Sequence, residues 1–161
     1  MKILTGNEEK EAIGYFHIAR DIAKQATCLR DKCGSVIVKD GEVIGKGFNS
    51  PPAGMEEQRR CNADKNKYHE KVKDKTCCVH AEQSAIYDAL AKNSDKITGS
   101  IIFFTRVDEN GEIIPSGEPY CTICSKASLH VGISEFVLWK EEGIKAYTTA
   151  EYNKISYEYK G

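Results

Sequence analysis

Apolar residues recur at helical spacing in three internal segments of the chain. In residues 8–25 they recur every three or four positions, which predicts an amphipathic helix that packs one face on the core. A second helix is expected over 81–93, with Leu90 among its core-facing residues. A third is expected over 121–131 and ends at Gly132, a residue type that commonly terminates helices.

Strand-forming residues occupy four further segments. Residues 35–39 and 42–49 are rich in β-formers and flank Asp40-Gly41, a pair that tolerates the positive φ angles of a tight hairpin turn. Residues 99–105 form an apolar run suited to a central strand that is covered on both faces. The last strand is expected over 135–140, and the helix between these two strands makes them a right-handed parallel pair.

The remaining segments are polar or irregular. Residues 55–76 carry seven basic and five acidic side chains, an excess of two positive charges, and are expected to form a solvated excursion rather than a phosphate site. Residues 106–117 are expected to form a small hairpin or a long loop. In the tail, 141–161, a capping box at Thr148–Glu151 predicts a helix. No repeat or linker divides residues 1–161, which are expected to form one domain.

Composition and charge favour a small-molecule substrate over nucleic acid. The 161 residues carry 23 basic and 24 acidic side chains, and a net charge of −1 gives no field for holding a polyanion. No apolar run approaches the roughly 20 residues that a membrane-spanning helix needs, so no membrane contact and a cytoplasmic location are expected. Seven cysteines in such a reducing compartment indicate metal-binding or catalytic thiols rather than a disulfide framework.

Two short motifs together predict a catalytic zinc site. His80-Ala81-Glu82 and the pair Cys121 and Cys124 each open an expected helix. One imidazole and two thiols are three of the four ligands of tetrahedral zinc, and the fourth position is left for a water whose pKa zinc lowers from about 15.7 to about 7. We therefore predict Zn²⁺ at His80, Cys121 and Cys124. Glu82 lies next to the ligands without being needed as one, and a carboxylate placed there can transfer protons.

A second, structural metal ion is an open alternative for the other cysteines. No C-x-x-C spacing supports such a site. The candidate ligands lie in or beside the polar excursion and before the first hairpin: Cys28, Cys33, Cys61, His69, Cys77 and Cys78.

Several segments resemble the zinc-dependent cytidine and deoxycytidylate deaminases, whose signature is H-x-E followed by P-C-x-x-C. The two halves read C-V-H-A-E-Q-S-A-I at 78–86 and E-P-Y-C-T-I-C at 118–124. Tyr120 separates the proline from the first cysteine, an insertion that is expected to shift the pocket wall. Three further segments are similar to the deoxycytidylate deaminase branch: T-C-L-R at 27–30, C-G-S-V-I-V-K-D at 33–40, and G-F-N-S-P-P-A-G at 47–54.

The resemblance spans roughly residues 9–140 and carries structural and functional implications. It implies an α/β fold of three layers, α/β/α, around a five-stranded mixed sheet, and a homo-oligomer. It implies the same zinc ligands and proton shuttle as the residues themselves. It also implies three substrate contacts, in which Asn49 bonds the sugar, Arg30 reaches a phosphate, and the backbone of Ala81 lies against the base.

The expected reaction is hydrolytic deamination of a cytosine nucleotide or nucleoside, with dCMP to dUMP favoured and ammonia released. One alternative keeps the chemistry and changes the base to guanine, adenosine, a pterin or a base in RNA. A second is a non-catalytic zinc module, in which a fourth side chain such as Cys77 or Cys78 closes the coordination sphere. A redox role for Cys121 and Cys124 is a weaker third.

Overall fold

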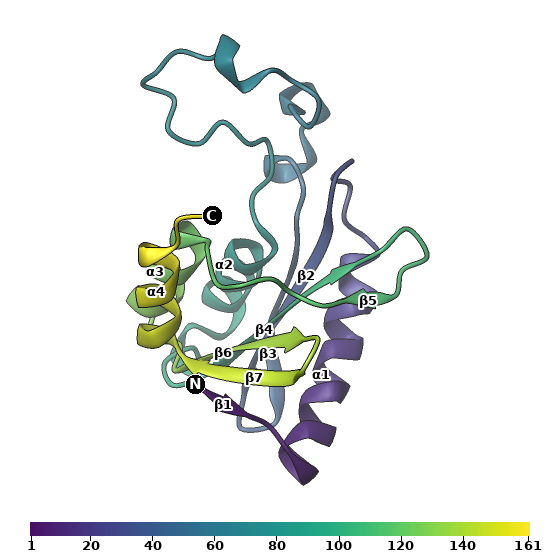
Figure 1. Ribbon diagram of the computed structural model, residues 1–161, viewed down its shortest axis with the longest axis vertical. Coiled ribbons are helices and arrows are strands. Elements are labelled where there is room, and N and C mark those ends of the chain that lie inside the picture. The colour runs from purple at the N-terminus through teal and green to yellow at the C-terminus, as the bar shows by residue number, and fades with distance from the viewer.

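The computed structural model describes all residues, 1–161, as one mixed sheet between helices (Figure 1). The sheet has seven strands in the order β1-β7-β6-β4-β2-β3, with β5 paired to β4. The resemblance implies a five-stranded mixed sheet, and the structure has five long strands with two short ones that raise the number to seven. The long strands are β2 (Lys32–Lys39), β3 (Glu42–Phe48), β4 (Ile101–Val107), β6 (Glu135–Lys140) and β7 (Gly143–Thr148), and the short ones are β1 (Lys2–Ile3) and β5 (Ile113–Ile114).

The first hairpin is formed as predicted. Strands β2 and β3 pair antiparallel, and the turn between them places Asp40 at φ 49° and Gly41 at φ 80°. Positive φ at both central residues is the geometry for which Asp-Gly is suited. The later excursion is the small hairpin of the two alternatives, because β5 returns antiparallel onto the end of β4 with Ile114 opposite Arg106.

The predicted parallel crossover is confirmed. Strands β4 and β6 pair parallel and are joined through α3 (Thr122–His130), which is followed by Gly132 at φ 82°. The tail 141–161 is only partly helical, so the expectation of a helical tail is wrong for its first part. Residues 143–148 form β7, antiparallel to β6, and α4 (Thr149–Glu158) begins after the capping residue Thr148.

Helices cover both faces of the sheet, which confirms the three-layer arrangement (Figure 1). One face packs on α1 (Gly6–Ala23), and the other packs on α2 (Ala81–Asn93) and α4. Side chains of β2 alternate between the two cores, with Val36 and Val38 on the α1 side and Ile37 on the other. Leu90 is 41% exposed, so its assignment to the core is wrong.

The polar excursion runs from the end of β3 to the start of α2 and extends away from the layered body (Figure 1). Its helical structure is limited to three short 3-10 turns, η1 (Pro52–Gly54), η2 (Glu56–Gln58) and η3 (Lys65–Lys67), and a single bridge pairs Ser50 with Val79. Most of its residues are exposed. One similar turn, η4 (Ser94–Lys96), follows α2. No helix has both the length and the apolarity needed to cross a membrane.

Candidate active site

A close contact between β3 and α2 fixes the first half of the site. A Cβ atom at Gly47 would lie 2.3 Å from the carbonyl oxygen of Ala81 and 2.3 Å from the amide nitrogen of Ala85. Only glycine therefore lets the first turn of α2 lie directly on the strand. His80 is the N-cap of this helix, and its backbone N–H donates to the side chain of Gln83 (3.2 Å).

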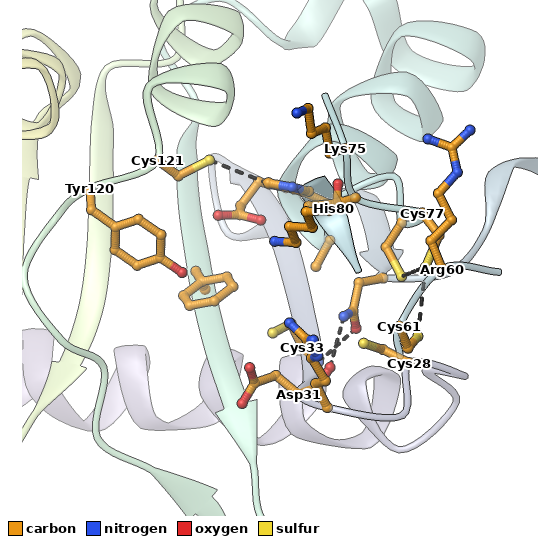
Figure 2. Close-up of a pocket in the computed structure, with 18 of the residues that line it drawn as sticks. Cys28, Asp31, Cys33, Arg60, Cys61, Lys75, Cys77, His80, Tyr120 and Cys121 are labelled. Carbon is orange, nitrogen blue, oxygen red and sulfur yellow. Dashed lines mark hydrogen bonds between the residues drawn. The ribbon is translucent and has the colours of Figure 1, made fainter. Parts of the chain in front are cut away.

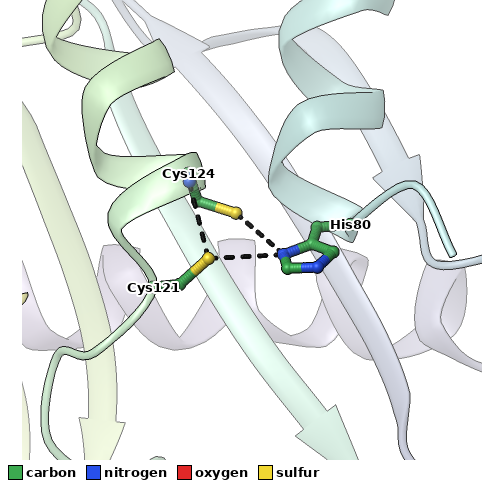
Figure 3. A group of neighbouring side chains, drawn as sticks. All are labelled: His80, Cys121 and Cys124. Carbon is green, nitrogen blue, oxygen red and sulfur yellow. Dashed lines mark hydrogen bonds between the residues drawn. The ribbon is translucent and has the colours of Figure 1, made fainter. Parts of the chain in front are cut away.

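The start of α3 supplies the second half. Cys121 is the N-cap of that helix, and the backbone N–H of Cys124 donates to its Sγ (3.5 Å). Because the two helices begin at neighbouring points of the sheet, the imidazole and both thiols converge (Figure 3). Unpaired N–H groups and the positive end of the dipole at a helix N-terminus favour thiolate over thiol.

The three converging side chains fit one zinc ion. Their ligand atoms all lie within 4.8 Å of one another. His80 Nδ1 is 3.2 Å from Cys124 Sγ and 3.3 Å from Cys121 Sγ. Tetrahedral zinc, with Zn–S near 2.3 Å and Zn–N near 2.0–2.1 Å, separates sulfur and nitrogen ligands by about 3.6 Å. A small outward adjustment would therefore complete the ligand set.

Hydrogen bonds among the three ligand side chains shift their pKa values, and Cys121 is held as a thiolate, the form that binds zinc. The Cys124 thiol, followed by His80, lowers the pKa of Cys121 to about 4 by hydrogen bonding. The pKa of His80 is raised to about 9, mainly by the hydrogen bond between the imidazole and Cys121. The hydrogen bond to Cys121 and then burial raise the pKa of Cys124. Zinc binds thiolates and neutral imidazole, so its binding here would release protons.

Glu82 is buried beside the ligands and is 5% exposed. Burial, reinforced by the charge of Cys121, raises its pKa to about 7. A carboxyl held beside the ligands is in reach to accept a proton and to return it. The structure therefore places a group suited to proton transfer at the wall of the cavity that also holds His80 and Cys121.

A cavity of about 220 Å³ opens over these residues (Figure 2). All three of the predicted substrate contacts line it: Arg30, Asn49 and Ala81. The Asn49 side chain is already held, since its Oδ1 accepts from the Cys33 N–H (2.8 Å) and its Nδ2 donates to the carbonyl of Asp31 (2.8 Å). The amide retains one N–H and one lone pair for a ligand.

Sequence reasoning missed two groups of cavity residues. Arg60, Lys65 and Lys75 reach the cavity from the polar excursion, which was expected to be only solvated. The excess of positive charge in that segment was the signal that could have found them. The second group is aromatic and has no local motif that identifies it: Phe104, Tyr120 and Tyr152.

Four of the six candidates for a second metal lie together. Cys77 Sγ is 3.6 Å from Cys61 Sγ and 3.7 Å from Cys78 Sγ, and Cys28 lies beside Cys61 (Figure 2) and affects the pKa values of Cys61 and Cys78. The backbone N–H of Leu29 is the main cause that lowers the pKa of Cys61 to about 7. We call these four cysteines the thiol cluster.

The other two candidates lie outside the thiol cluster. Cys33 lies on β2 with its N–H bound to Asn49. His69 is exposed, and its Nδ1 accepts from the backbone N–H of Lys71 (3.1 Å). The contacts of the thiol cluster could not be predicted from spacing, because its members come from three separate parts of the chain.

The fold and the His-Cys-Cys group define a zinc-dependent deaminase, and comparison with known proteins gives the family. Residues 9–140 match the cytidine and deoxycytidylate deaminase zinc-binding region, and the chain belongs to that family. A deoxycytidylate deaminase of Mycobacterium phage D29 is 30% identical over 133 residues, which cover 79% of this chain and 92% of that protein. The fission yeast (Schizosaccharomyces pombe) deoxycytidylate deaminase is 26% identical over 84% of this chain, which spans 39% of the yeast protein.

Solved structures agree with the fold. The dCMP deaminase of cyanophage S-TIM5, in complex with dCMP and dUMP, superposes with a TM-score of 0.53 at 26% identity, over 83% of this chain and 82% of that one. A cytidine deaminase from Burkholderia pseudomallei has a TM-score of 0.56 at 19% identity, over 87% and 94% of the two chains. The second likeness supports the fold alone.

Proposed function

We propose that the protein hydrolyses the exocyclic amine of a cytosine nucleotide, with dCMP favoured, and releases the uracil nucleotide and ammonia. The observation that carries the proposal is a buried carboxyl, Glu82, on the wall of a cavity shared with His80 and Cys121. The same cavity is lined by basic side chains that suit a phosphate. The similarity to the phage D29 deoxycytidylate deaminase supports the same substrate class.

In this proposal His80, Cys121 and Cys124 hold zinc and Glu82 moves protons. Zinc in the site would supply a water activated for nucleophilic attack, since it lowers the pKa of water from about 15.7 to about 7. A carboxylate oxygen of Glu82 would take one proton from the attacking water and pass it to the ring nitrogen. It would then take the second proton, from the hydroxyl now bonded to the ring carbon, and pass it to the exocyclic amine, which leaves as ammonia while the carbonyl forms. A positioned general base of this kind contributes roughly 10²- to 10⁴-fold.

The cavity offers a separate set of contacts for the rest of the nucleotide. The backbone of Ala81 lies against the base and the remaining N–H of Asn49 bonds the sugar. Arg30 binds the phosphate with help from Arg60 and Lys75. None of these three basic side chains forms an ion pair with an acidic residue of the chain. The Arg60 guanidinium lies over the Tyr68 ring, 4.6 Å from its centroid, and keeps its charge for a ligand.

A substrate panel tests the assignment. Purified protein is incubated with dCMP, dCTP, cytidine and deoxycytidine, and the ultraviolet change on deamination is followed beside Glu82→Ala. We expect turnover of the monophosphate and its loss in the variant. No turnover of any cytosine compound would reject the substrate class. A parallel panel of guanine, adenosine, a pterin and a tRNA tests deamination of another base.

The thiol cluster supports a second, structural zinc as part of the proposal, because the Cys77 sulfur already contacts those of Cys61 and Cys78, and a rearrangement that brings in Cys28 would give the four thiolates of a tetrahedral site. Metal analysis of protein purified without chelator should then give two zinc ions per chain, and one after Cys61→Ser. A value of one in the unmodified protein would reject the second ion.

The homo-oligomer and the cytoplasmic location also belong to the proposal. Light scattering of the purified protein checks the oligomeric state.

A further inference from the structure

Tyr120 stands between a buried proline and a proposed zinc ligand, Cys121, and its backbone is held on both sides. Before it, the buried Lys140 ammonium donates to the carbonyl of Gly117 (3.1 Å) and to the carboxylate of Glu118 (2.6 Å). After it, Cys121 forms the N-cap of α3. The position of the Tyr120 Cα is therefore fixed by the same contacts that position the ligand.

The side chain of Tyr120 is much less restrained than this backbone. It lines the cavity yet is 66% exposed, and its hydroxyl makes no hydrogen bond within the chain. The other two aromatic residues of the cavity are more fixed, because Tyr152 is buried and stacked on Phe136 (3.9 Å between ring centroids) and Phe104 is half-buried on β4. Tyr120 is thus the aromatic ring of the cavity that can adjust to a ligand.

Tyr120 and Arg60 lie on different sides of the cavity (Figure 2). Figure 2 shows Tyr120 beside Cys121, with its ring directed toward the pocket, and Arg60 and Cys77 across from it beyond His80. A nucleotide has an apolar, planar base at one end and an anionic phosphate at the other. This separation suits a substrate whose base lies on the Tyr120 side and whose phosphate lies toward the polar excursion.

Tyr159 supports the Tyr120 ring from outside the cavity. The two ring centroids are 5.9 Å apart with an interplanar angle of 42°. Such tilted aromatic pairs are attractive beyond their buried area. Tyr159 follows α4 in the chain and does not line the cavity itself, so it can act on a ligand only through Tyr120.

We propose that Tyr120 is a substrate-binding residue whose ring stacks on the pyrimidine of the bound nucleotide, with Tyr159 as a positioning residue behind it. This inference rests on the proposed function. It adds the residue that covers one face of the base. The residue between Pro119 and Cys121 then forms part of the binding surface. Stacking of an aromatic side chain on a base strengthens binding by roughly 5- to 100-fold.

Steady-state kinetics with dCMP and direct binding of dUMP test the role of Tyr120. Tyr120→Ala should raise KM for dCMP and Kd for dUMP by about 5- to 100-fold while kcat stays within about threefold. Tyr120→Phe keeps the ring and should remain within about twofold of the unmodified protein. Tyr159→Ala should give a smaller rise in KM. Tyr87→Ala removes a ring that is exposed on α2 outside this cavity and serves as the matched control.

Each contrary outcome has a distinct meaning. Unchanged KM and Kd in Tyr120→Ala would overturn the inference while leaving the proposed function intact. An equal loss in Tyr120→Phe would overturn it as well, since the hydroxyl rather than the ring would then bind the substrate. A fall in bound zinc in Tyr120→Ala would show a structural role and overturn it. If the unmodified protein neither turns over dCMP nor binds dUMP, both the function and this inference fail.

Discussion

Glu82→Gln should stabilise the metal-free protein at high pH and leave it unchanged at low pH. Glu82 is 5% exposed, and burial is the main cause that raises its pKa in the folded chain from 4.5 to about 7. The folded state therefore holds this proton more strongly than the unfolded state does. Folding stability must then fall as the pH rises from about 4.5 to about 7, because ionisation of the buried carboxyl is easier after unfolding.

The size of the effect follows from the two pKa values. They differ by about 2.5 pH units, and at about 1.36 kcal/mol per unit the ionised carboxyl costs about 3 kcal/mol of unfolding free energy above pH 7. Glutamine keeps the shape of the side chain without the charge. Since 1 kcal/mol shifts Tm by about 2–4 °C in a chain of this size, the variant should melt about 6–12 °C higher at pH 8.

Thermal melts of both proteins with chelator, at pH 5 and at pH 8, measure this difference. The exposed Glu57→Gln is the control and should give no pH-dependent gain. Zinc should shrink the gain at pH 8, because a dication beside the carboxylate stabilises its charged form. Equal Tm changes for Glu82→Gln at the two pH values would show that the Glu82 carboxyl has the same pKa in the folded and unfolded states, contrary to this prediction.

Two further predictions concern the scaffold. Gly47→Ala should lower the free energy of unfolding by about 1–3 kcal/mol and reduce zinc content, because the added Cβ would displace the first turn of α2. Gly14→Ala is the control and should do neither, because a Cβ there meets nothing within 4 Å. Urea denaturation and metal analysis of the two variants check this. Lys140→Met should leave a folded protein with lower affinity for dCMP, because the loop before Cys121 loses its contacts to Gly117 and Glu118, and unchanged kinetics would contradict that role.

Local signals predicted the elements that carry the zinc ligands. The Asp40-Gly41 turn, the parallel pair 99–105 and 135–140, and the helix starts at His80 and Cys121 follow from short-range rules of backbone geometry. The order of these elements in the sheet is then enough to bring the imidazole and the two thiols together. The zinc ligands could for this reason be predicted from the sequence.

Features that depend on packing between distant segments could not be predicted from the sequence. Residues 143–148 mix polar and apolar side chains, and their pairing with β6 has no signal in local composition. Leu90 has the helical spacing of a core residue, but the buried face of α2 includes Ala85, Ile86 and Ala89 and leaves Leu90 largely in solvent. The thiol cluster and Tyr159 beside Tyr120 join parts of the chain that no periodicity relates.

Bound zinc and dCMP turnover, measured together in Glu82→Ala and Cys121→Ser, separate the metal ligands from the proton carrier. His80, Cys121 and Cys124 are proposed to hold the ion, while Glu82 only moves protons. We expect Glu82→Ala to retain all of its zinc and to lose roughly 10²-fold or more of its turnover, and Cys121→Ser to bind one zinc fewer. Full turnover in Glu82→Ala, or an unchanged zinc content in Cys121→Ser, would contradict these roles.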